Sequence, residues 1–301
     1  MIVNKPFSEA LLELEDQSIQ LAFTSPPYED MITYRGKDKD DIYYSGSLGY
    51  EHIGLYWLDL FEALERPMKD DGVVGIVIND KRKDRVMSVS NYIGMIEVVE
   101  RGWNLIEHAA WFKLNGIGKN PKAGLQDWWE HIYLFSKTNK YKYYPERIRG
   151  KYSKEIRDRY EFGGKMKVRK IGSMSSRARS AGMEEFTGED HETEIEINKD
   201  GKLLPNVLTV APDTVRRNIH PARFPPKLAE WAITLCTDPD DLVVDPMCGS
   251  GTTLMVAKAM RRKFFGSDIG KDFVELATSE VENTAIQDDL FSIEDVFVTE
   301  V

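Results

Sequence analysis

The stretch Asp241–Ile269, DLVVDPMCGSGTTLMVAKAMRRKFFGSDI, contains a complete strand–loop–helix–strand unit. It begins with Leu242–Val244, a short apolar run of the kind that is buried on both faces of a parallel sheet. The loop that follows contains Gly249 and Gly251, which let the backbone turn sharply and approach a ligand closely. A helical segment then leads to a second apolar strand that ends at Asp268. The unit predicts an α/β fold in which a helix connects two parallel strands.

The glycine loop differs in sequence from the common phosphate-binding loops. No Gly-Lys-Ser/Thr follows it, and Leu254 stands where a dinucleotide fingerprint requires its third glycine. Asp245 precedes the loop and disfavours a pyrophosphate ligand, because like charges repel. Asp268 follows about twenty residues later, where an acid binds the hydroxyl pair of a ribose. The pattern favours a nucleoside cofactor without phosphates, of which S-adenosylmethionine is one. A tight turn without a ligand is the alternative.

The other apolar segments extend the alternation of strands and helices along the chain. Predicted strands are 19–23, 73–80, 106–113 and 128–137, and predicted helices lie within 50–67, 89–99, 224–237 and 271–283. Such alternation predicts a doubly wound, mostly parallel sheet of the α/β class. Ligands of these sheets bind beyond the carboxyl ends of the strands, near the point where the strand order reverses.

Residues 144–205 no longer show the periodic spacing of apolar residues, and we interpret them as an inserted region. The net charge of the chain is −10, yet Lys142–Ser180 has thirteen Lys/Arg against four Asp/Glu, and residues 181–200 have one Lys against eight Asp/Glu. The net charge alone argues weakly against a nucleic-acid partner, whereas this uneven distribution of charge favours one. A solvated insertion with two charge blocks is equally consistent with the sequence. The expected organisation is two halves of one domain, 1–143 and 206–301, separated by the insertion 144–205.

Composition excludes several classes of protein. The chain has 301 residues, of which 42% are hydrophobic, so a large core is available. Its two cysteines, Cys236 and Cys248, lie in no CxxC or Cys/His cluster, which predicts neither disulfides nor a metal site. No apolar run reaches the length of a membrane span, and the N-terminus lacks a secretory core. We therefore expect a cytoplasmic protein, of prokaryotic or phage origin, with no membrane contact.

The segment Phe23–Tyr28, FTSPPY, must end the first predicted strand, because adjacent prolines cannot donate backbone hydrogen bonds. Together, "TSPPY" and the later "DPMCGSGTT" resemble motifs IV and I of the amino-methylating DNA methyltransferases, in the order of their permuted β-class. "WFK…WWEHIYLFSK" resembles the antiparallel hairpin of that family, and "NIHPARFPPKLAEWAI" and "FFGSDI" resemble segments that flank its cofactor loop. The resemblance covers most of the chain. It implies a Rossmann-like fold that uses S-adenosyl-L-methionine, with residues 144–205 as the target-recognition region.

The resemblance also implies roles for individual residues. The catalytic residues would be Ser25, Pro26, Pro27 and Tyr28. In the family this tetrapeptide holds a base turned out of the duplex, because the target atom is unreachable inside it. The Pro26 carbonyl and Ser25 would orient the exocyclic amine, and Tyr28 would stack on the ring. The expected cofactor-binding residues are Thr24, Phe224, Pro225, Asp245, Pro246, Met247, Gly249, Ser250, Gly251, Thr252, Thr253 and Asp268.

The choice of base follows from the family pattern, and the expected DNA contacts follow from the basic residues of the insertion. A serine at the position of Ser25 is frequent in cytosine-N4 enzymes, so we favour cytosine N4 over adenine N6. Cytosine C5 methylation is disfavoured, because the chain has no Pro-Cys pair in a catalytic loop. Expected contacts to double-stranded DNA come from Lys165, Lys167, Arg169, Lys170, Arg177 and Arg179, which predicts salt-sensitive binding. A cognate restriction endonuclease is a further candidate partner, and monomer and homodimer both stay open.

Two alternatives of another class stay open, and two details depart from the family. The alternatives are a non-catalytic protein that binds S-adenosylmethionine and DNA, and a methyltransferase for RNA or small amines. The family often has Gly-Asp where this chain reads "NKPF", and Asp16, the nearest acid, aligns with a turn. Met247-Cys248 replaces an aromatic residue of the cofactor loop. His220 is more often structural than catalytic, and the basic run 81–85 contacts phosphate or only solvent.

Overall fold

The computed structural model describes two compact units of the chain. The described residues are 1–27, 34–35, 42–44, 50–80, 82–83, 86–114, 128–150, 152, 165–169, 192–196, 198, 201–212 and 223–287. The first unit contains Met1–Ile148 and Pro205–Val298, and the second contains Arg149–Leu204 and the last three residues.

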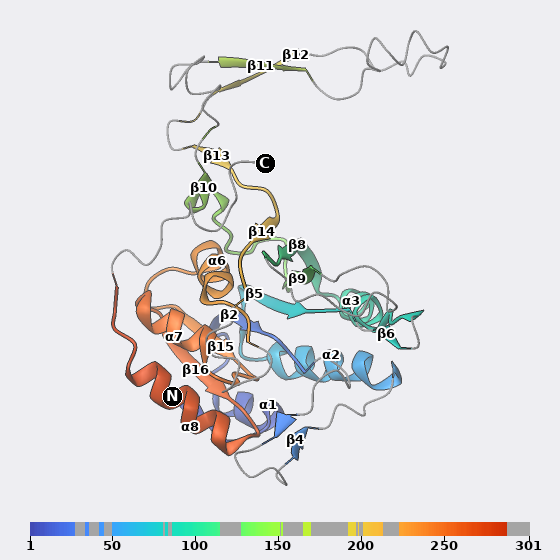
Figure 1. The fold of residues 1–301 in the computed structure, drawn as a ribbon, viewed down its shortest axis with the longest axis vertical. Helices are drawn as coiled ribbons and strands as arrows, with labels where there is room; N and C mark the ends of the chain where they lie inside the picture. Colours follow the sequence, from blue (N-terminus) through green and yellow to red (C-terminus); the bar gives the residue numbers. More distant parts are fainter. Residues whose placement is uncertain are drawn as a thin grey trace. The chain divides into compact units, whose positions relative to one another are not determined.

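The first unit is built on an eight-stranded sheet with the order β1-β16-β15-β2-β5-β9-β8-β14 (Figure 1). Every neighbouring pair is parallel except those of β9, which is antiparallel to both β5 and β8. The mostly parallel sheet with an antiparallel hairpin, predicted from the sequence, is therefore confirmed. The strands are β1 (Ile2–Val3), β2 (Ile19–Thr24), β5 (Met68–Ile78), β8 (Asn104–Phe112), β9 (Trp129–Ser136), β14 (Val207–Thr209), β15 (Leu242–Asp245) and β16 (Lys263–Ser267).

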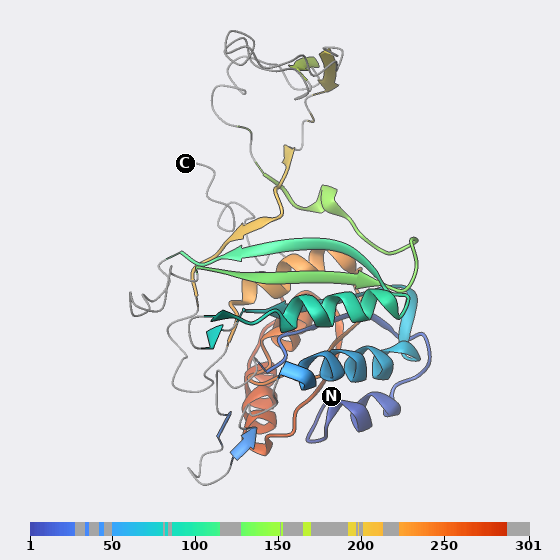
Figure 2. The same ribbon diagram turned by 90° about the vertical axis from the view of Figure 1, so that its right-hand side faces the viewer.

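Helices cover both faces of this sheet (Figure 2). One face buries Trp57 and Phe61 of α2 against Tyr133 and Phe135 of β9. The opposite face packs against α6 and α7, and there the Phe23 ring meets the edge of the Phe224 ring, with 5.5 Å between centroids. The helices are α1 (Phe7–Ala10), α2 (Tyr50–Glu65), α3 (Ser90–Glu100), α6 (Pro226–Cys236), α7 (Thr252–Ala259) and α8 (Lys271–Glu282).

The predicted and observed elements differ mainly at the strand ends. β5 begins at Met68 rather than at residue 73, because Met68 pairs with Ile19 of β2 before the apolar run starts. β1 and β14 have no apolar run long enough to predict them, and they are strands because they pair with β16 and β8. Shorter elements in this unit are η1 (Leu11–Glu13), β3 (Tyr34–Arg35), β4 (Ile42–Tyr44), β6 (Arg82–Lys83), β7 (Val86–Met87) and η3 (Pro145–Arg147).

The second unit contains two short antiparallel pairs. β10 (Arg149–Gly150) pairs with β13 (Lys202–Leu203), and β11 (Lys165–Arg169) pairs with β12 (Glu192–Glu196). In the second pair, the register places basic residues opposite acidic ones: Lys165 with Glu196, Lys167 with Glu194 and Arg169 with Glu192.

The boundary of the second unit lies five residues after the expected start of the insertion at 144. The backbone N–H of Tyr144 donates to the Leu235 carbonyl over 2.8 Å. The Arg147 guanidinium lies 2.6 Å from the Asp238 carboxylate, whose pKa it holds well below the usual range together with Lys142. These contacts attach the segment before Arg149 to the first unit.

Within the described ranges, no helix is both long and apolar enough to cross a membrane. The same residues contain no cluster of His, Cys, Asp and Glu that could hold a metal ion. Both cysteines are buried as free thiols.

Candidate functional site

The reversal of strand order lies between β15 and β2. These strands are parallel neighbours, with Val244 paired to Ala22. After β15 the chain passes through α7 to β16 on one side, whereas after β2 it passes through α2 to β5 on the other. The two connections diverge, so a crevice opens at the carboxyl ends of the strands, where α/β proteins bind ligands.

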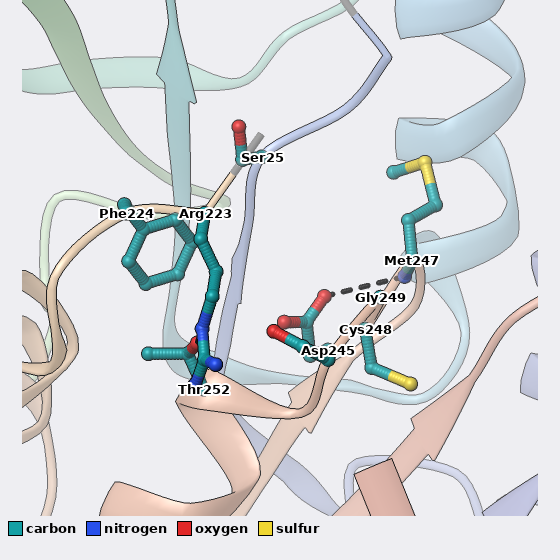
Figure 3. A pocket seen from close by; sticks show the side chains of 9 residues that line it. Ser25, Arg223, Phe224, Asp245, Met247, Cys248, Gly249 and Thr252 are labelled. Atoms are coloured by element: carbon teal, nitrogen blue, oxygen red, sulfur yellow. Dashed lines mark hydrogen bonds between the residues drawn. The ribbon is translucent and has the colours of Figure 1, made fainter. Parts of the chain in front are cut away.

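A small pocket, partly open to solvent, lies at this point (Figure 3). Its walls come from the end of β2, the segment before α6, and the loop between β15 and α7. The lining residues are Ser25, Arg223, Phe224, Asp245, Met247, Cys248, Gly249, Ser250 and Thr252. Residues more than 200 positions apart in the sequence therefore share one cavity.

The glycine loop has a fixed backbone conformation. Gly249 and Gly251 have φ of 48° and 81°, a left-handed region that favours glycine. The Gly251 N–H donates to the Cys248 carbonyl over 2.7 Å, and the Gly251 carbonyl accepts the first bond of α7 from Met255. Ser267 of β16 ties the loop down, because its carbonyl accepts from the Cys248 N–H and its hydroxyl donates to the Pro246 carbonyl. The loop thus presents the N-terminus of α7 to the pocket.

Asp268 lies beneath this loop and holds it. Its Oδ2 accepts from the Gly249 N–H over 2.9 Å, and its Oδ1 accepts from the Gly270 N–H over 2.8 Å. Burial raises the pKa of Asp268, and these backbone hydrogen bonds oppose the rise. Asp268 does not line the pocket. Its hydrogen bond to the Gly249 N–H shows instead that it anchors the glycine loop.

Asp245 is the buried charge of the pocket. Its side chain accepts from the Met247 N–H over 3.2 Å, and the residue is 3% exposed. Burial raises the pKa of Asp245 to about 6, while the hydroxyls of Thr24 and Thr253 oppose the shift. At neutral pH the carboxylate is ionised in a site of low polarity, where it attracts a cationic ligand group.

We expect Asp245→Asn to stabilise the ligand-free protein at pH 7.5. An acid whose folded-state pKa is about 6 and whose unfolded value is 3.8 contributes stability below pH 4 that is lost as the pH rises through 6. The loss amounts to about 3 kcal/mol, from roughly two pKa units at 1.36 kcal/mol each. Urea unfolding between pH 4 and pH 7.5 measures it. The wild type should lose stability relative to Asp245→Asn over this range, and parallel pH profiles would contradict the assignment. Asp70→Asn, at an exposed site, is the control.

One hydrogen bond connects the two motifs across the sheet. Thr253 of α7 donates its hydroxyl to the Phe23 carbonyl of β2 over 3.1 Å, in a buried position. Phe23 immediately precedes Thr24 and Ser25, so this bond ties the end of β2 to the first turn of α7. The bond therefore connects α7, which follows the glycine loop, to the strand that leads into the predicted catalytic segment.

We expect Thr253→Val to lower kcat/KM by about 10-fold with a loss of only about 1 kcal/mol of stability. Valine keeps the shape of threonine but cannot donate to the Phe23 carbonyl, and it also removes the hydroxyl that lowers the pKa of Asp245. Thr278→Val is a matched control, because Thr278 makes a comparable bond to the Val274 carbonyl within α8, outside the pocket. Methyl-transfer kinetics and urea unfolding of both variants measure the effect. Equal losses of activity in the two variants would contradict it.

Most of the predicted cofactor residues lie around one cavity. Thr24 and Thr253 are buried beside it, Pro246 and Gly251 belong to its loop, and Pro225 is the N-cap of α6. The predicted set omitted two lining residues, Arg223 and Cys248. Figure 3 shows the Arg223 side chain running beside Phe224 toward Thr252, and its Nε donates to the Thr252 hydroxyl over 3.3 Å. Arg223 could have been predicted from the sequence, because it is a cationic residue immediately before the predicted cofactor residues Phe224 and Pro225.

The structure shows what the residues do at two positions where the sequence departs from the family pattern, the segment "NKPF" and Met247. Asn4 of "NKPF" donates from Nδ2 to the carbonyls of Asp268 and Ile269, over 2.9 and 3.0 Å, so it supports the end of β16. Asp16 is paired with Arg66 outside the pocket lining. Met247 receives a hydrogen bond at its sulfur from the hydroxyl of Tyr56 in α2. Its side chain is therefore held toward α2.

Several predicted site residues lie outside the described residues. These are Tyr28, Lys170, Arg177, Arg179 and His220. Lys165, Lys167 and Arg169 are described only as backbone positions of β11 in the second unit. Of the basic run 81–85, Arg82 and Lys83 form β6.

A polar cluster absent from the sequence predictions lies at the end of β5, the strand next to β2. The Asp80 carboxylate bonds His131 Nε2 over 3.0 Å and the Asn91 side-chain amide over 3.1 Å. On its other side, His131 Nδ1 lies 3.1 Å from the Tyr133 hydroxyl and 3.0 Å from His108 Nε2. If Asp80 accepts from Nε2–H of a neutral His131, Nδ1 is an acceptor for both neighbours. The cluster fixes the carboxyl end of β5 beside the Ser-Pro-Pro turn.

Comparisons with known proteins find DNA methyltransferases among the similar chains. Type II methyltransferase M.BglII from Bacillus subtilis is 27% identical over 92% of this chain and 67% of its own length. The orphan methyltransferase M.BamHII from Bacillus amyloliquefaciens is 27% identical over 90% of this chain and 91% of its own. Among solved structures, the PvuII DNA methyltransferase (cytosine-N4-specific) aligns with a TM-score of 0.64 and 21% identity, covering 97% of this chain and 88% of that one.

The family assignment rests on a match that spans both motifs. The DNA methylase family of N6/N4 enzymes matches residues 19–279, from the first residue of β2 into α8. This range includes the Ser-Pro-Pro turn, the glycine loop and all the lining residues of the pocket. The chain belongs to the N6/N4 DNA methylase family.

Proposed function

We propose that this DNA methyltransferase methylates the exocyclic N4 amine of cytosine, in a base turned out of the duplex. The observation that carries the proposal is the shared pocket: Ser25 of the Ser-Pro-Pro turn and Asp245 of the cofactor loop line the same cavity. A methyl donor and an amine held in one cavity can react without a covalent enzyme intermediate. The contribution of the protein is then orientation and exclusion of water.

The pocket suits S-adenosyl-L-methionine as the cofactor, which supplies a methyl group on a positively charged sulfur. The Thermus thermophilus protein TTHA0409, solved in complex with S-adenosyl-L-methionine, has a similar fold, with a TM-score of 0.57 and 17% identity. We propose that Asp245, which lines the pocket, holds the ammonium of the methionine moiety. Thr252 at the N-terminus of α7, together with Arg223, offers donors to its carboxylate. We assign the adenosine to the side of Asp268 and the glycine loop.

On the substrate side, Ser25 and the carbonyl of Pro26 orient the amine. The Ser25 hydroxyl can donate and accept, so it fits an amine next to a ring nitrogen. Prolines 26 and 27 fix φ and prevent the turn from joining the sheet, which keeps the carbonyl available. We propose that Tyr28 stacks on the extruded base.

Cytosine N4 is favoured by Ser25, and by the fold of an enzyme described as cytosine-N4-specific. Adenine N6 is the alternative within the same family. Cytosine C5 methylation requires a thiolate nucleophile, and Cys248 is the one cysteine of the chain that lines the pocket. Burial raises the pKa of the Cys248 thiol well above its usual value, so the thiolate is disfavoured.

We propose that the second unit recognises the DNA target. The sequence of β11 alternates Lys165, Lys167 and Arg169 with apolar residues, and these positions pair in register with Glu196, Glu194 and Glu192 of β12. The proposed contacts are Lys165, Lys167, Arg169, Lys170, Arg177 and Arg179. A cognate restriction endonuclease is a possible partner in the cell, since relatives are named both Type II and orphan methyltransferases.

The test is methyl transfer from labelled S-adenosyl-L-methionine to unmodified genomic DNA, followed by mass spectrometry of the nucleosides. We expect N4-methylcytosine from the wild type and a loss of rate of about 100-fold in Ser25→Ala, with cofactor affinity retained. N6-methyladenine as the product would overturn the choice of base but keep the site. Absence of any methylated base, with cofactor binding intact, would favour a non-catalytic DNA-binding protein or an RNA or small-amine substrate.

A further inference from the structure

The chain enters the second unit through a segment that adds no strand to the main sheet. After β9 ends, residues 137–148 contain only the short helix η3, and β10 then begins at Arg149. The chain leaves the second unit differently, because β14 pairs with β8 and the Trp111 indole N–H donates to the Val210 carbonyl over 2.9 Å. Strand pairing therefore holds the exit, and other contacts must hold the entry.

Arg147, the last residue of η3, holds the entry to the loop that follows α6. Its guanidinium donates to the Thr237 carbonyl over 2.8 Å and to the Asp238 carboxylate over 2.6 Å. Its Cζ atom also lies 3.6 Å from the centroid of the Tyr144 ring. Two directed hydrogen bonds and one stacking contact fix the orientation of a planar guanidinium. We call Arg147, Tyr144, Thr237 and Asp238 the Arg147 clamp.

Asp238, the acidic residue of the clamp, has further partners that keep it in place. Its carboxylate lies 3.0 Å from Lys142 Nζ and accepts from the Tyr144 hydroxyl over 3.2 Å. Its backbone N–H donates to the Asp241 carboxylate over 2.8 Å, and Lys142 also bonds that carboxylate, over 2.7 Å. The clamp is therefore part of a charged network rather than an isolated ion pair.

The location of the clamp suits orientation of the chain better than stability. The side chains of Arg147 and Asp238 are 35% and 38% exposed, and ion pairs this open to solvent contribute little to stability. Only Ile148, which is buried, separates Arg147 from the first residue of β10. Arg149 is held in turn, because its guanidinium donates to the Gly201 carbonyl over 2.9 Å. The chain thus has one residue in which to change direction after the clamp.

We propose that Arg147 is a positioning residue for DNA methylation, because it fixes the backbone at the entry to the second unit. This inference rests on the proposed role of that unit in recognising DNA. A fixed entry restricts the arrangements that the second unit samples, so less conformational entropy is lost when DNA binds. Loss of the clamp raises the KM for DNA. It leaves kcat and cofactor affinity unchanged, since no residue of the clamp lines the pocket.

The experiment measures methyl incorporation from labelled S-adenosyl-L-methionine as a function of the concentration of unmodified genomic DNA. We expect Arg147→Gln to raise the KM for DNA about 10-fold, with kcat changed by less than about 2-fold. Arg147→Lys keeps a charge beside Asp238 but loses the planar set of donors, so its KM should be intermediate. Cofactor affinity, measured by calorimetry, should stay at the wild-type value. The dissociation constant for the same DNA, from fluorescence anisotropy, should rise as KM does and requires no turnover.

Arg66→Gln is the matched control within the first unit. Arg66 pairs with Asp16 and donates to the carbonyls of Leu11 and Leu12, so it makes the same kinds of contact as Arg147. We expect a similar small loss of stability in urea, with an unchanged KM for DNA. Asp238→Asn weakens the clamp from its other side. Combined with Arg147→Gln, it should raise KM no further than Arg147→Gln alone, because both changes remove one interaction.

A triple variant, Lys165→Gln with Lys167→Gln and Arg169→Gln, tests the role of the second unit by itself. A KM raised by the triple variant but not by Arg147→Gln would overturn the positioning role and keep the proposed recognition. A KM raised by neither would overturn both. Equal increases in Arg147→Gln and Arg66→Gln would also overturn the positioning role, because they would reflect stability alone. Methyl incorporation is counted whichever base receives the methyl group, so a product other than N4-methylcytosine would leave this result intact.

Discussion

Asp268→Ala should weaken S-adenosyl-L-methionine binding by at least about 100-fold, which corresponds to about 2.7 kcal/mol. The carboxylate accepts hydrogen bonds from the N–H groups of Gly249 and Gly270. Hydrogen bonds to a charged group contribute about 1.5–3 kcal/mol each, and the glycine loop loses its support when they are removed. The proposed contact with the ribose is lost at the same time. Isothermal titration calorimetry with the purified variant measures the affinity.

A graded series distinguishes support of the loop from general damage. Asp268→Asn keeps one carbonyl oxygen as an acceptor, so we expect an affinity between those of the wild type and the alanine variant. Asp70→Ala removes an exposed carboxylate from the early part of β5 and should leave the affinity unchanged. An unchanged affinity in Asp268→Ala would refute both roles of this residue.

Gly251→Ala should destabilise the protein by about 3 kcal/mol and abolish cofactor binding at micromolar concentrations. The residue has φ of 81°, where an L-amino acid is strained by about 1–2 kcal/mol. Its new Cβ would also lie 2.9 Å from the Cβ of Ala277 and 3.1 Å from its Cα, both in α8. Overpacking of this kind costs about 1–3 kcal/mol, because backbone must move. Urea unfolding measures the loss of stability.

Gly102→Ala is the matched control for the backbone strain alone. Gly102 has φ of 99°, and nothing lies within 4 Å of a Cβ built there. We expect it to lower the free energy of unfolding by about 1 kcal/mol and to leave cofactor affinity unchanged. The difference between the two variants reports the packing of the glycine loop on α8. Equal destabilisation would mean that this packing contributes little.

The glycine loop and the Ser-Pro-Pro turn were predictable because their conformations depend on local chemistry. Glycine at positions 249 and 251 permits positive φ, and the proline pair ends β2, whatever the rest of the chain does. Long apolar runs such as 73–78 were equally clear, since burial on both faces of a sheet requires them. The edge strands β1 and β14 could not be predicted. Their extended form comes from hydrogen bonds to β16 and β8, and two or three residues hold no pattern of their own.

The sequence by itself determined the order of the motifs, the class of fold and the residue types of the Ser-Pro-Pro segment. Only the tertiary structure decided which of these residues share a cavity. It added Arg223 and Cys248 to the pocket, placed Asp268 beneath the loop, and turned Ile93 and Ile96 outward. The physical reason is that the spacing of apolar residues predicts which face of a helix or strand is buried. It does not predict which other element packs against that face. That choice is made by strand pairing and crossover connections between segments far apart in the chain, and by the close fit of Gly94 on Trp57.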